Sequence, residues 1–190
     1  MPEIGKWWRH VIFHVRGAWL PGDPRGFRSR RHEIHSSGDY KNPPPEGEHR
    51  GLRRYHQARS ERVVKMAENL RKVIGAAVVW VLQKEGYRVL VTSVGATHVH
   101  VLAELPVDLG EVHAVVGRCK AKASWAVGII CPRLRWAGGG SFKWVRDREH
   151  QMEVYRYILE KQGTDAWTWN FRNAAPEKPK RWKTMPPQAE

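Results

Sequence analysis

Apolar residues along the chain follow two spacings, one of every second residue and one of every three to four residues. The first is typical of half-buried strands and the second of helices with one buried face. Proline or glycine stands where several of these patterns stop, as at Pro21, Gly86 and Pro106. The patterns predict strands over Arg9–Trp19, Arg88–Val94, Thr97–Leu105, Arg133–Ala137 and Ser141–Val145, and helices over Val64–Lys84, Asp108–Val127 and Asp147–Lys161.

The order of these elements is strand, helix, two strands, helix, one or two strands, helix. This order predicts an α+β fold, with a ferredoxin-like antiparallel sheet and helices packed on it. We expect one domain over residues 1–172. Residues 21–56 are rich in Pro and Gly and carry eight Lys or Arg against five acids, so we interpret them as a long basic loop insertion after the first strand. We expect residues 173–190 to form a mobile basic, Pro-rich tail.

The charge of the chain indicates its partner. Lys and Arg number 33 against 19 Asp and Glu, which gives a formal net charge of +14. Such a surplus favours a polyanionic partner. The chain has ten Trp, several of them beside cations, as base stacking combined with phosphate pairing requires. Trp80 and Trp125 have the simpler interpretation of packing residues. No apolar run is long enough for a membrane span and no signal peptide is evident, so we expect a cytoplasmic protein that binds nucleic acid rather than a membrane.

His98 and His100 are the first candidates for chemistry. They lie one residue apart in an apolar run, so a strand would place both imidazoles on one face and Val99 and Val101 on the other. Two neighbouring imidazoles make half of a divalent-metal site. The alternative is that two histidines on a half-exposed strand have no function.

The last predicted helix carries two tyrosines. At about 100° per residue, Tyr155 shares an apolar arc with Met152 and Leu159. Tyr157 falls nearly opposite, on the polar side. Tyr155 is therefore expected in the core, and Tyr157 is expected to be presented for chemistry or to be an ordinary amphipathic residue.

Taken together, these segments resemble the one-tyrosine HUH transposases, and most of all the REP-associated tyrosine transposase-like branch. The resemblance rests on Thr97-His-Val-His-Val-Leu-Ala-Glu-Leu105, on a following helix with Lys120 and Ser124, and on Arg146-Asp-Arg-Glu-His150 leading to Tyr157-Ile158. It extends from about Trp8 to Phe171. It implies a transposase that cleaves and rejoins single-stranded DNA beside a hairpin, through a 5′-phosphotyrosine on Tyr157, with His98 and His100 holding Mg²⁺ or Mn²⁺.

The third metal ligand has three candidates in this chain. Insertion-sequence members commonly place a glutamine one turn after the tyrosine, where this chain has Lys161. Gln162 follows, and on an ideal helix it would point to the apolar arc, so it can serve only if the helix loosens before Gly163. Glu153 and Glu160 are the alternatives. Lys161 is our candidate for favouring the phenolate of Tyr157.

The predicted nucleic-acid contacts are cations of the second helix and of the predicted hairpin: Arg118, Lys120, Lys122, Arg133, Arg135, Lys143 and Arg146. A catalytically inactive protein that binds DNA or RNA hairpins is the main alternative, and a small metalloprotein unrelated to nucleic acid is a weaker one. The sequence leaves open whether the protein is a monomer or a homodimer.

Overall fold

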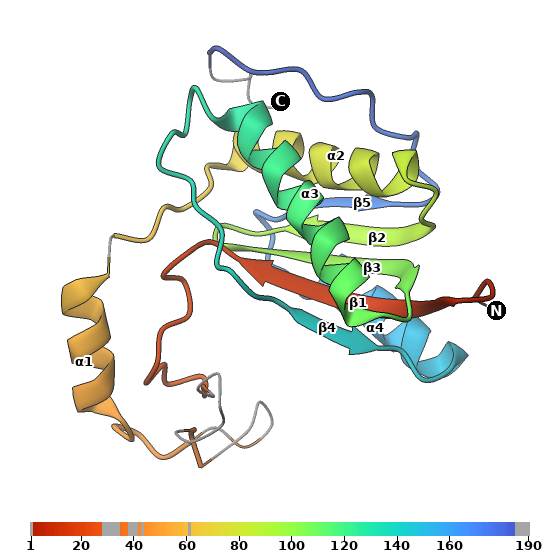
Figure 1. Ribbon diagram of the computed structural model, residues 1–190. Coiled ribbons are helices and arrows are strands. Elements are labelled where there is room, and N and C mark those ends of the chain that lie inside the picture. Colours follow the sequence, from red (N-terminus) through yellow and green to blue (C-terminus); the bar gives the residue numbers. More distant parts are fainter. Residues whose placement is uncertain (1, 28–34, 38–41, 43, 61, 185–190) are drawn as a thin grey trace. The chain divides into compact units, whose positions relative to one another are not determined.

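The computed structural model describes residues 2–27, 35–37, 42, 44–60 and 62–184. Within these residues the chain forms an α+β structure with five strands and four helices (Figure 1). The strands are β1 (Lys6–His14), β2 (Val89–Val94), β3 (His98–Pro106), β4 (Ser141–Trp144) and β5 (Trp167–Asn170), and the helices are α1 (Arg50–Arg59), α2 (Glu68–Lys84), α3 (Leu109–Val127) and α4 (Arg148–Glu160).

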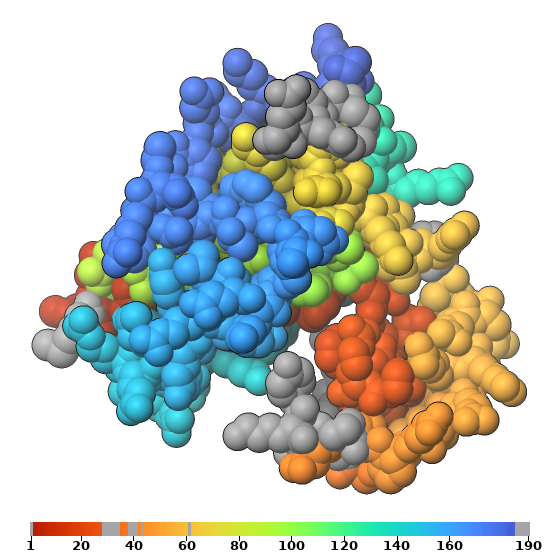
Figure 2. Space-filling view, turned by 180° about the vertical axis from the view of Figure 1, so that it is seen from behind, coloured from red at the N-terminus to blue at the C-terminus, as the bar shows by residue number. Residues whose placement is uncertain are grey.

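The strands form one sheet in the order β4-β1-β3-β2-β5, and every neighbouring pair is antiparallel. Helices α2 and α3 cover one face of this sheet, and α4 lies behind the other (Figure 1). Seen from behind, α4 and the C-terminal part of the chain occupy the near side (Figure 2). The predicted antiparallel sheet with packed helices is therefore confirmed, but one helix lies on the face opposite the other two.

Alternation along β3 divides its side chains between the two faces. Val99, Val101 and Leu105 are buried beneath the layer of α2 and α3. Leu102 faces the other way and forms a core cluster with Ile158 of α4 and three further buried apolar residues. The apolar residues of both faces are removed from water, which is the main force holding the layers together. His98 and His100 lie on the α4 face, with Leu102.

Residues Arg16–Val63 form a compact unit separate from the sheet unit, which comprises Met1–Val15 and Val64–Glu190. The interpretation of 21–56 as a loop was wrong at its end, because Arg50–Arg59 is a helix. The last proline of the region is Pro45, so the residues that follow it keep their backbone donors and can form a helix. Arg28, Arg30, Arg31 and Lys41 of the insertion lie outside the described residues.

The predicted hairpin of Arg133–Ala137 with Ser141–Val145 was also wrong. Residues 141–144 form β4, but β4 pairs with β1, and the earlier segment contributes only an isolated bridge from Trp136 to Val15. The Lys120 ammonium donates hydrogen bonds to the Ala137 and Gly139 carbonyls, at 2.8 Å each. These bonds hold the segment beside α3, so it cannot fold back on β4.

The C-terminal part of the sheet was not predicted. Strand β5 pairs with β2, and its Trp167 ring packs directly against Gly75 of α2, where any β-carbon would collide with the ring. Beyond it, residues 174–184 have no helix or strand, although the Trp182 amide donates to the Ala126 carbonyl. Within the described residues, no helix is long and apolar enough to span a membrane.

Candidate functional site

Four histidines meet on the α4 face of the sheet. In the register of β1 and β3, His14 is the partner of His98, and Ile12 is the partner of His100. Paired residues of antiparallel strands point to the same face, and His10, two residues before Ile12, points there too. The His14 and His98 rings have centroids 5.9 Å apart. Two adjacent strands therefore supply a cluster of imidazoles.

His100 is held by a neighbouring histidine. Its Nδ1 lies 2.9 Å from Nε2 of His10, and both side chains are buried. Burial lowers the pKa of His100 to about 2, with a further effect from the surrounding histidines. Burial also lowers the pKa of His10 to about 4, assisted by Lys143 and His150. Both rings are therefore neutral near neutral pH, which is the form that binds metals. Since the hydrogen bond occupies Nδ1, it leaves Nε2 of His100 for other contacts.

Tyr157 of α4 lies against this pair. Its ring centroid is 5.7 Å from that of His100 and 6.0 Å from that of His10, with edge-to-face geometry. The expectation that Tyr157 lies on a polar arc opposite the core was wrong, because its half-buried side chain packs beside the core cluster. Met152, which the helical spacing placed on the apolar arc, is 40% exposed. When Met152 is left out, the centre of the apolar arc on this helix shifts slightly towards Tyr157. Tyr155 flanks the same cluster and contacts Phe171.

Gln162 reaches the histidines because α4 ends early. The helix stops at Glu160, and Gly163 adopts a left-handed conformation with φ 93°, which is typical of residues that follow a helix. The side-chain Nε2 of Gln162 donates to the backbone carbonyl of Tyr157 at 3.2 Å. The Oε1 of Gln162 therefore faces Nε2 of His98, at 3.3 Å. Of the predicted third ligands, Gln162 is the one that the structure brings to the histidine pair.

The other predicted candidates on α4 have different positions. Glu153 lies among residues that line a shallow surface hollow on the outer side of the helix, with Arg148 and Met152, and Glu160 is exposed. Lys161 is also exposed, and its backbone amide donates to the Tyr157 carbonyl at the end of the helix.

The donors partly fit a divalent cation. In an octahedral ion with bonds of about 2.1 Å, neighbouring ligand atoms lie about 3 Å apart, which is near the 3.3 Å between His98 Nε2 and Gln162 Oε1. His98 and His100 stand nearly perpendicular, at 85°. Ser93, the register partner of His100, is buried, and its hydroxyl has no hydrogen-bond partner among the described residues. The described residues contain no group of three or more His, Cys, Asp or Glu able to hold a metal. Gln162 is the candidate third ligand that lies beside His98.

The predicted DNA-contacting cations are divided between the two faces. Lys143 pairs in register with His10 and so lies on the histidine face, at the edge of the sheet. Arg118 and Lys122 belong to α3, on the opposite side. Arg118 makes a two-bond contact with Glu85, at 2.7 Å for each bond. Lys120 is used for structure, because its ammonium holds the two carbonyls described above.

The remaining three predicted cations lie on connecting segments. Arg135 donates to the Pro132 and Leu134 carbonyls, while Arg133 and Arg146 are exposed. Of the seven cations, Lys143 lies on β4, which pairs with β1, and Arg146 lies between β4 and α4.

His10 and His14 were missed in the sequence. Alternation along β1 already placed them on one face, in the pattern His-x-Ile-x-His, but nothing in the chain gave the register that sets them opposite His98 and His100. Comparisons with protein-family models, with curated proteins and with solved structures found no match.

Proposed function

We propose that this protein is a metal-dependent nuclease and strand-transferase of the HUH transposase type, which acts on single-stranded or hairpin DNA through Tyr157. The observation that carries the proposal is the convergence of Tyr157, Gln162 and the His98/His100 pair on one face of the sheet. These residues come from β3, from α4 and from the segment after it. Two segments that are distant in the sequence thus supply a tyrosine beside a set of possible metal donors.

The fold supports the same proposal. Without β5 and α1, the strand order is β4-β1-β3-β2, and the elements run strand, helix, two strands, helix, strand. This order fits the ferredoxin-like, split β-α-β arrangement that is part of the proposal. Helix α4 is then an addition on the open face, where it covers the middle strands. A ferredoxin-like core with a tyrosine helix on its open face is the architecture that the HUH resemblance implies.

The residues present can divide the chemistry among them. The Tyr157 oxygen attacks the scissile phosphorus, the bond from phosphorus to the 3′ oxygen breaks, and a 5′-phosphotyrosine and a free 3′-hydroxyl result. That hydroxyl, or another, can reverse the step and join strands without ATP. His98, His100 and Gln162 would hold Mn²⁺ or Mg²⁺, which when bound neutralises charge on the phosphate oxygens. Imidazole donors favour Mn²⁺ over the harder Mg²⁺. Lys143 and Arg146 would contact the phosphate backbone of the substrate.

The test is a denaturing gel of the protein with end-labelled hairpin DNA and Mn²⁺. We expect a protein–DNA band that survives boiling in detergent and maps to Tyr157 by peptide mass spectrometry. Hairpins of both polarities are needed, each flanked by single strands on both sides. The absence of any adduct across these substrates, with either metal, would contradict the proposal. If adducts form, DNA of the nucleoid is the expected cellular target.

A second candidate function is a catalytically inactive protein that binds DNA or RNA hairpins on the same fold. The absence of a three-residue His, Cys, Asp or Glu metal group among the described residues favours it, as does Lys161 at the position where related transposases carry a glutamine. Tight hairpin binding without adduct or cleavage would establish this alternative.

A further inference from the structure

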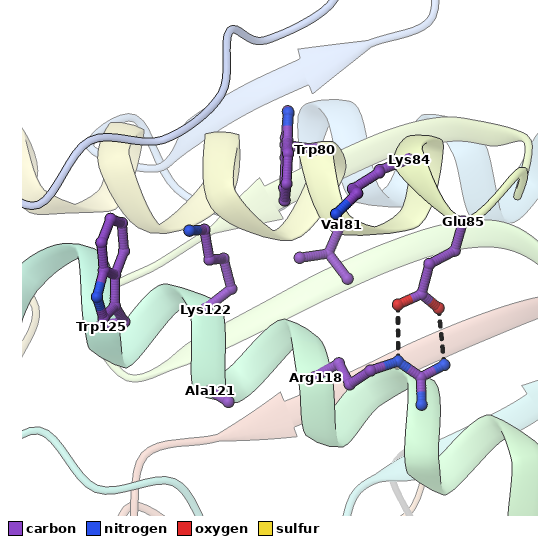
Figure 3. A pocket seen from close by; sticks show the side chains of 8 residues that line it. All are labelled: Trp80, Val81, Lys84, Glu85, Arg118, Ala121, Lys122 and Trp125. Atoms are coloured by element: carbon purple, nitrogen blue, oxygen red, sulfur yellow. Dashed lines mark hydrogen bonds and ion pairs between the residues drawn. The ribbon is translucent and has the colours of Figure 1, made fainter.

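Helices α2 and α3 form an open groove on the outer surface of the helical layer, on the side of the sheet opposite the histidines. The groove has a volume of about 440 Å³. Trp80 and Lys84 enter it from α2, and Lys122 and Trp125 from α3 (Figure 3). All four side chains belong to the sheet unit and lie on packed neighbouring helices.

The two indoles of the groove are available to a ligand. Trp125 is 42% exposed, and Trp80 is half-buried. The Lys122 ammonium lies between them, 3.7 Å from the ring centroid of Trp125 and 5.4 Å from that of Trp80 (Figure 3). The Lys84 ammonium is 5.0 Å from Trp80 on its other flank. An exposed apolar surface of this kind costs free energy in water unless something covers it.

The charge of the groove is positive. Burial lowers the pKa of the Lys122 ammonium, and the positive charges of Lys178 and Lys84 lower it further. The acid that lines the groove, Glu85, is neutralised by its two hydrogen bonds with Arg118. Lys84 and Lys122 thus lie against the two indoles, with Lys178 near Lys122, and an anion arriving there would relieve their mutual repulsion.

We propose that this groove binds a segment of single-stranded nucleic acid, with bases stacked on Trp80 and Trp125 and phosphates paired with Lys84, Lys122 and Lys178. Aromatic rings interleaved with cations are the usual platform for unpaired strands, because every base offers a face for stacking and every linkage offers an anion. A duplex keeps its bases stacked internally and cannot use the indoles. The C-terminal segment carries Lys178, Lys180, Arg181 and Lys183, and it brings further positive charge to α3, where the Trp182 amide donates to the Ala126 carbonyl.

This site is independent of the proposed nuclease. It lies on the other face of the sheet, and none of its residues contacts Tyr157 or the histidines in the described structure. It would hold a strand whether or not the protein cleaves DNA. In a nuclease, it would hold single-stranded DNA that continues beyond the cleavage site.

The test is the affinity of the full chain for a fluorescent 20-nucleotide oligo(dT), measured by anisotropy at several salt concentrations. Trp80→Ala and Trp125→Ala should each weaken binding by roughly 5-fold or more, since stacking contributes about 1–3 kcal/mol per base. Trp7→Ala is the matched control, because Trp7 is 44% exposed but lies outside the groove. Lys84→Gln should reduce the salt dependence, whereas Lys72→Gln on the exposed side of the same helix should not.

Competition identifies the ligand. Unlabelled oligo(dT) or oligo(U) should displace the probe far better than duplex DNA or polyglutamate, and the tighter of the two single strands identifies DNA or RNA as the source. Wild-type affinity in Trp80→Ala and Trp125→Ala, an equal loss in Trp7→Ala, or equal competition by polyglutamate would each overturn the proposal. The Tyr157→Phe variant should show the same pattern. If the wild type forms the adduct but Trp80→Ala and Trp125→Ala bind oligo(dT) as tightly as the wild type, the groove proposal is wrong and the nuclease proposal is unaffected.

Discussion

Aromatic and basic side chains gather on both faces of the sheet, but they differ in burial and charge. On the α4 face, His10 and His100 are buried, neutral and held by a hydrogen bond to each other. On the α2/α3 face, Lys122 and Trp125 are more accessible to solvent. The Lys122 ammonium contacts the Trp125 ring, and the ion pair among the residues that line the groove joins Arg118 to Glu85. A preorganised, desolvated site suits chemistry on a fixed atom. An accessible, charged surface suits a flexible strand.

Tyr157, the proposed nucleophile, gives the largest expected effect on the α4 face. Tyr157→Phe removes only the hydroxyl, so DNA affinity and stability should be kept while the covalent adduct disappears completely. Tyr155→Phe is the matched control, since Tyr155 lies on the same helix against Phe171, and it should form adduct at near-normal levels. The measurement is the detergent-resistant band. An adduct that persists in Tyr157→Phe would show that another residue is the nucleophile.

The histidine pair should follow closely in size. His98→Ala or His100→Ala should abolish Mn²⁺-dependent cleavage and leave hairpin binding nearly unchanged, because phosphate and base contacts supply the affinity. Chelation with EDTA should stop cleavage by the wild-type protein, and added Mn²⁺ should restore it. Cleavage at full rate by the double variant would eliminate the proposed metal site.

His10 tests whether the buried hydrogen bond positions His100. His10→Phe keeps a ring of similar shape but removes the partner of His100 Nδ1, so Mn²⁺ affinity should fall by about 10- to 100-fold. Titration of the free protein with Mn²⁺, followed by electron paramagnetic resonance, measures this without any activity assay. His113→Gln, at an exposed site on α3, is the control. An affinity equal to wild type would mean that His10 serves packing alone.

The two buried imidazoles should make stability depend on pH. Their folded pKa values, about 4 for His10 and about 2 for His100, lie below 6.5, the ordinary pKa of histidine. The unfolded chain therefore binds more protons below pH 6.5, and the free energy of unfolding should decrease as pH falls from about 7 towards 4. The expected loss is on the order of 1–2 kcal/mol per histidine by pH 5. Urea denaturation at several pH values measures the free energy of unfolding. A free energy that stays constant with pH, and is the same in His10→Phe as in the wild type, would contradict the prediction.

Two neighbouring lysines of α3 give the smallest expected effects and separate structure from binding. Lys120→Met leaves the Ala137 and Gly139 carbonyls without their donor, so stability should fall by about 1–3 kcal/mol. Lys122→Met should change stability by less than about 0.5 kcal/mol. Lys122→Met should instead reduce, by about 0.7, the slope with which the logarithm of oligo(dT) affinity falls against the logarithm of salt concentration. Urea denaturation and anisotropy measure both variants, and identical behaviour would contradict the distinction.

The sequence by itself determined most elements of the sheet unit and the shared face of His98 and His100. Alternation and helical recurrence are local properties, because the direction of a side chain depends only on the backbone dihedrals around it. The predicted strands Arg88–Val94 and Thr97–Leu105 therefore lie within a residue or so of β2 and β3, and the predicted last helix nearly matches α4. Where local patterns were weak, as in β5 and α1, the prediction missed the element.

Only the tertiary structure decided which side chains from distant segments meet on each face of the sheet. The register of β1 against β3 brings His10 to His100 and His14 to His98 across more than eighty residues of chain, and no local pattern encodes a register between distant strands. The end of α4 at Glu160 redirects Gln162 towards His98, whereas an ideal helix would have turned it away. The packing of α2 against α3 places Trp80 and Trp125 around one lysine. Each of these contacts depends on how elements pack, and packing is a property of the whole folded chain rather than of any single segment.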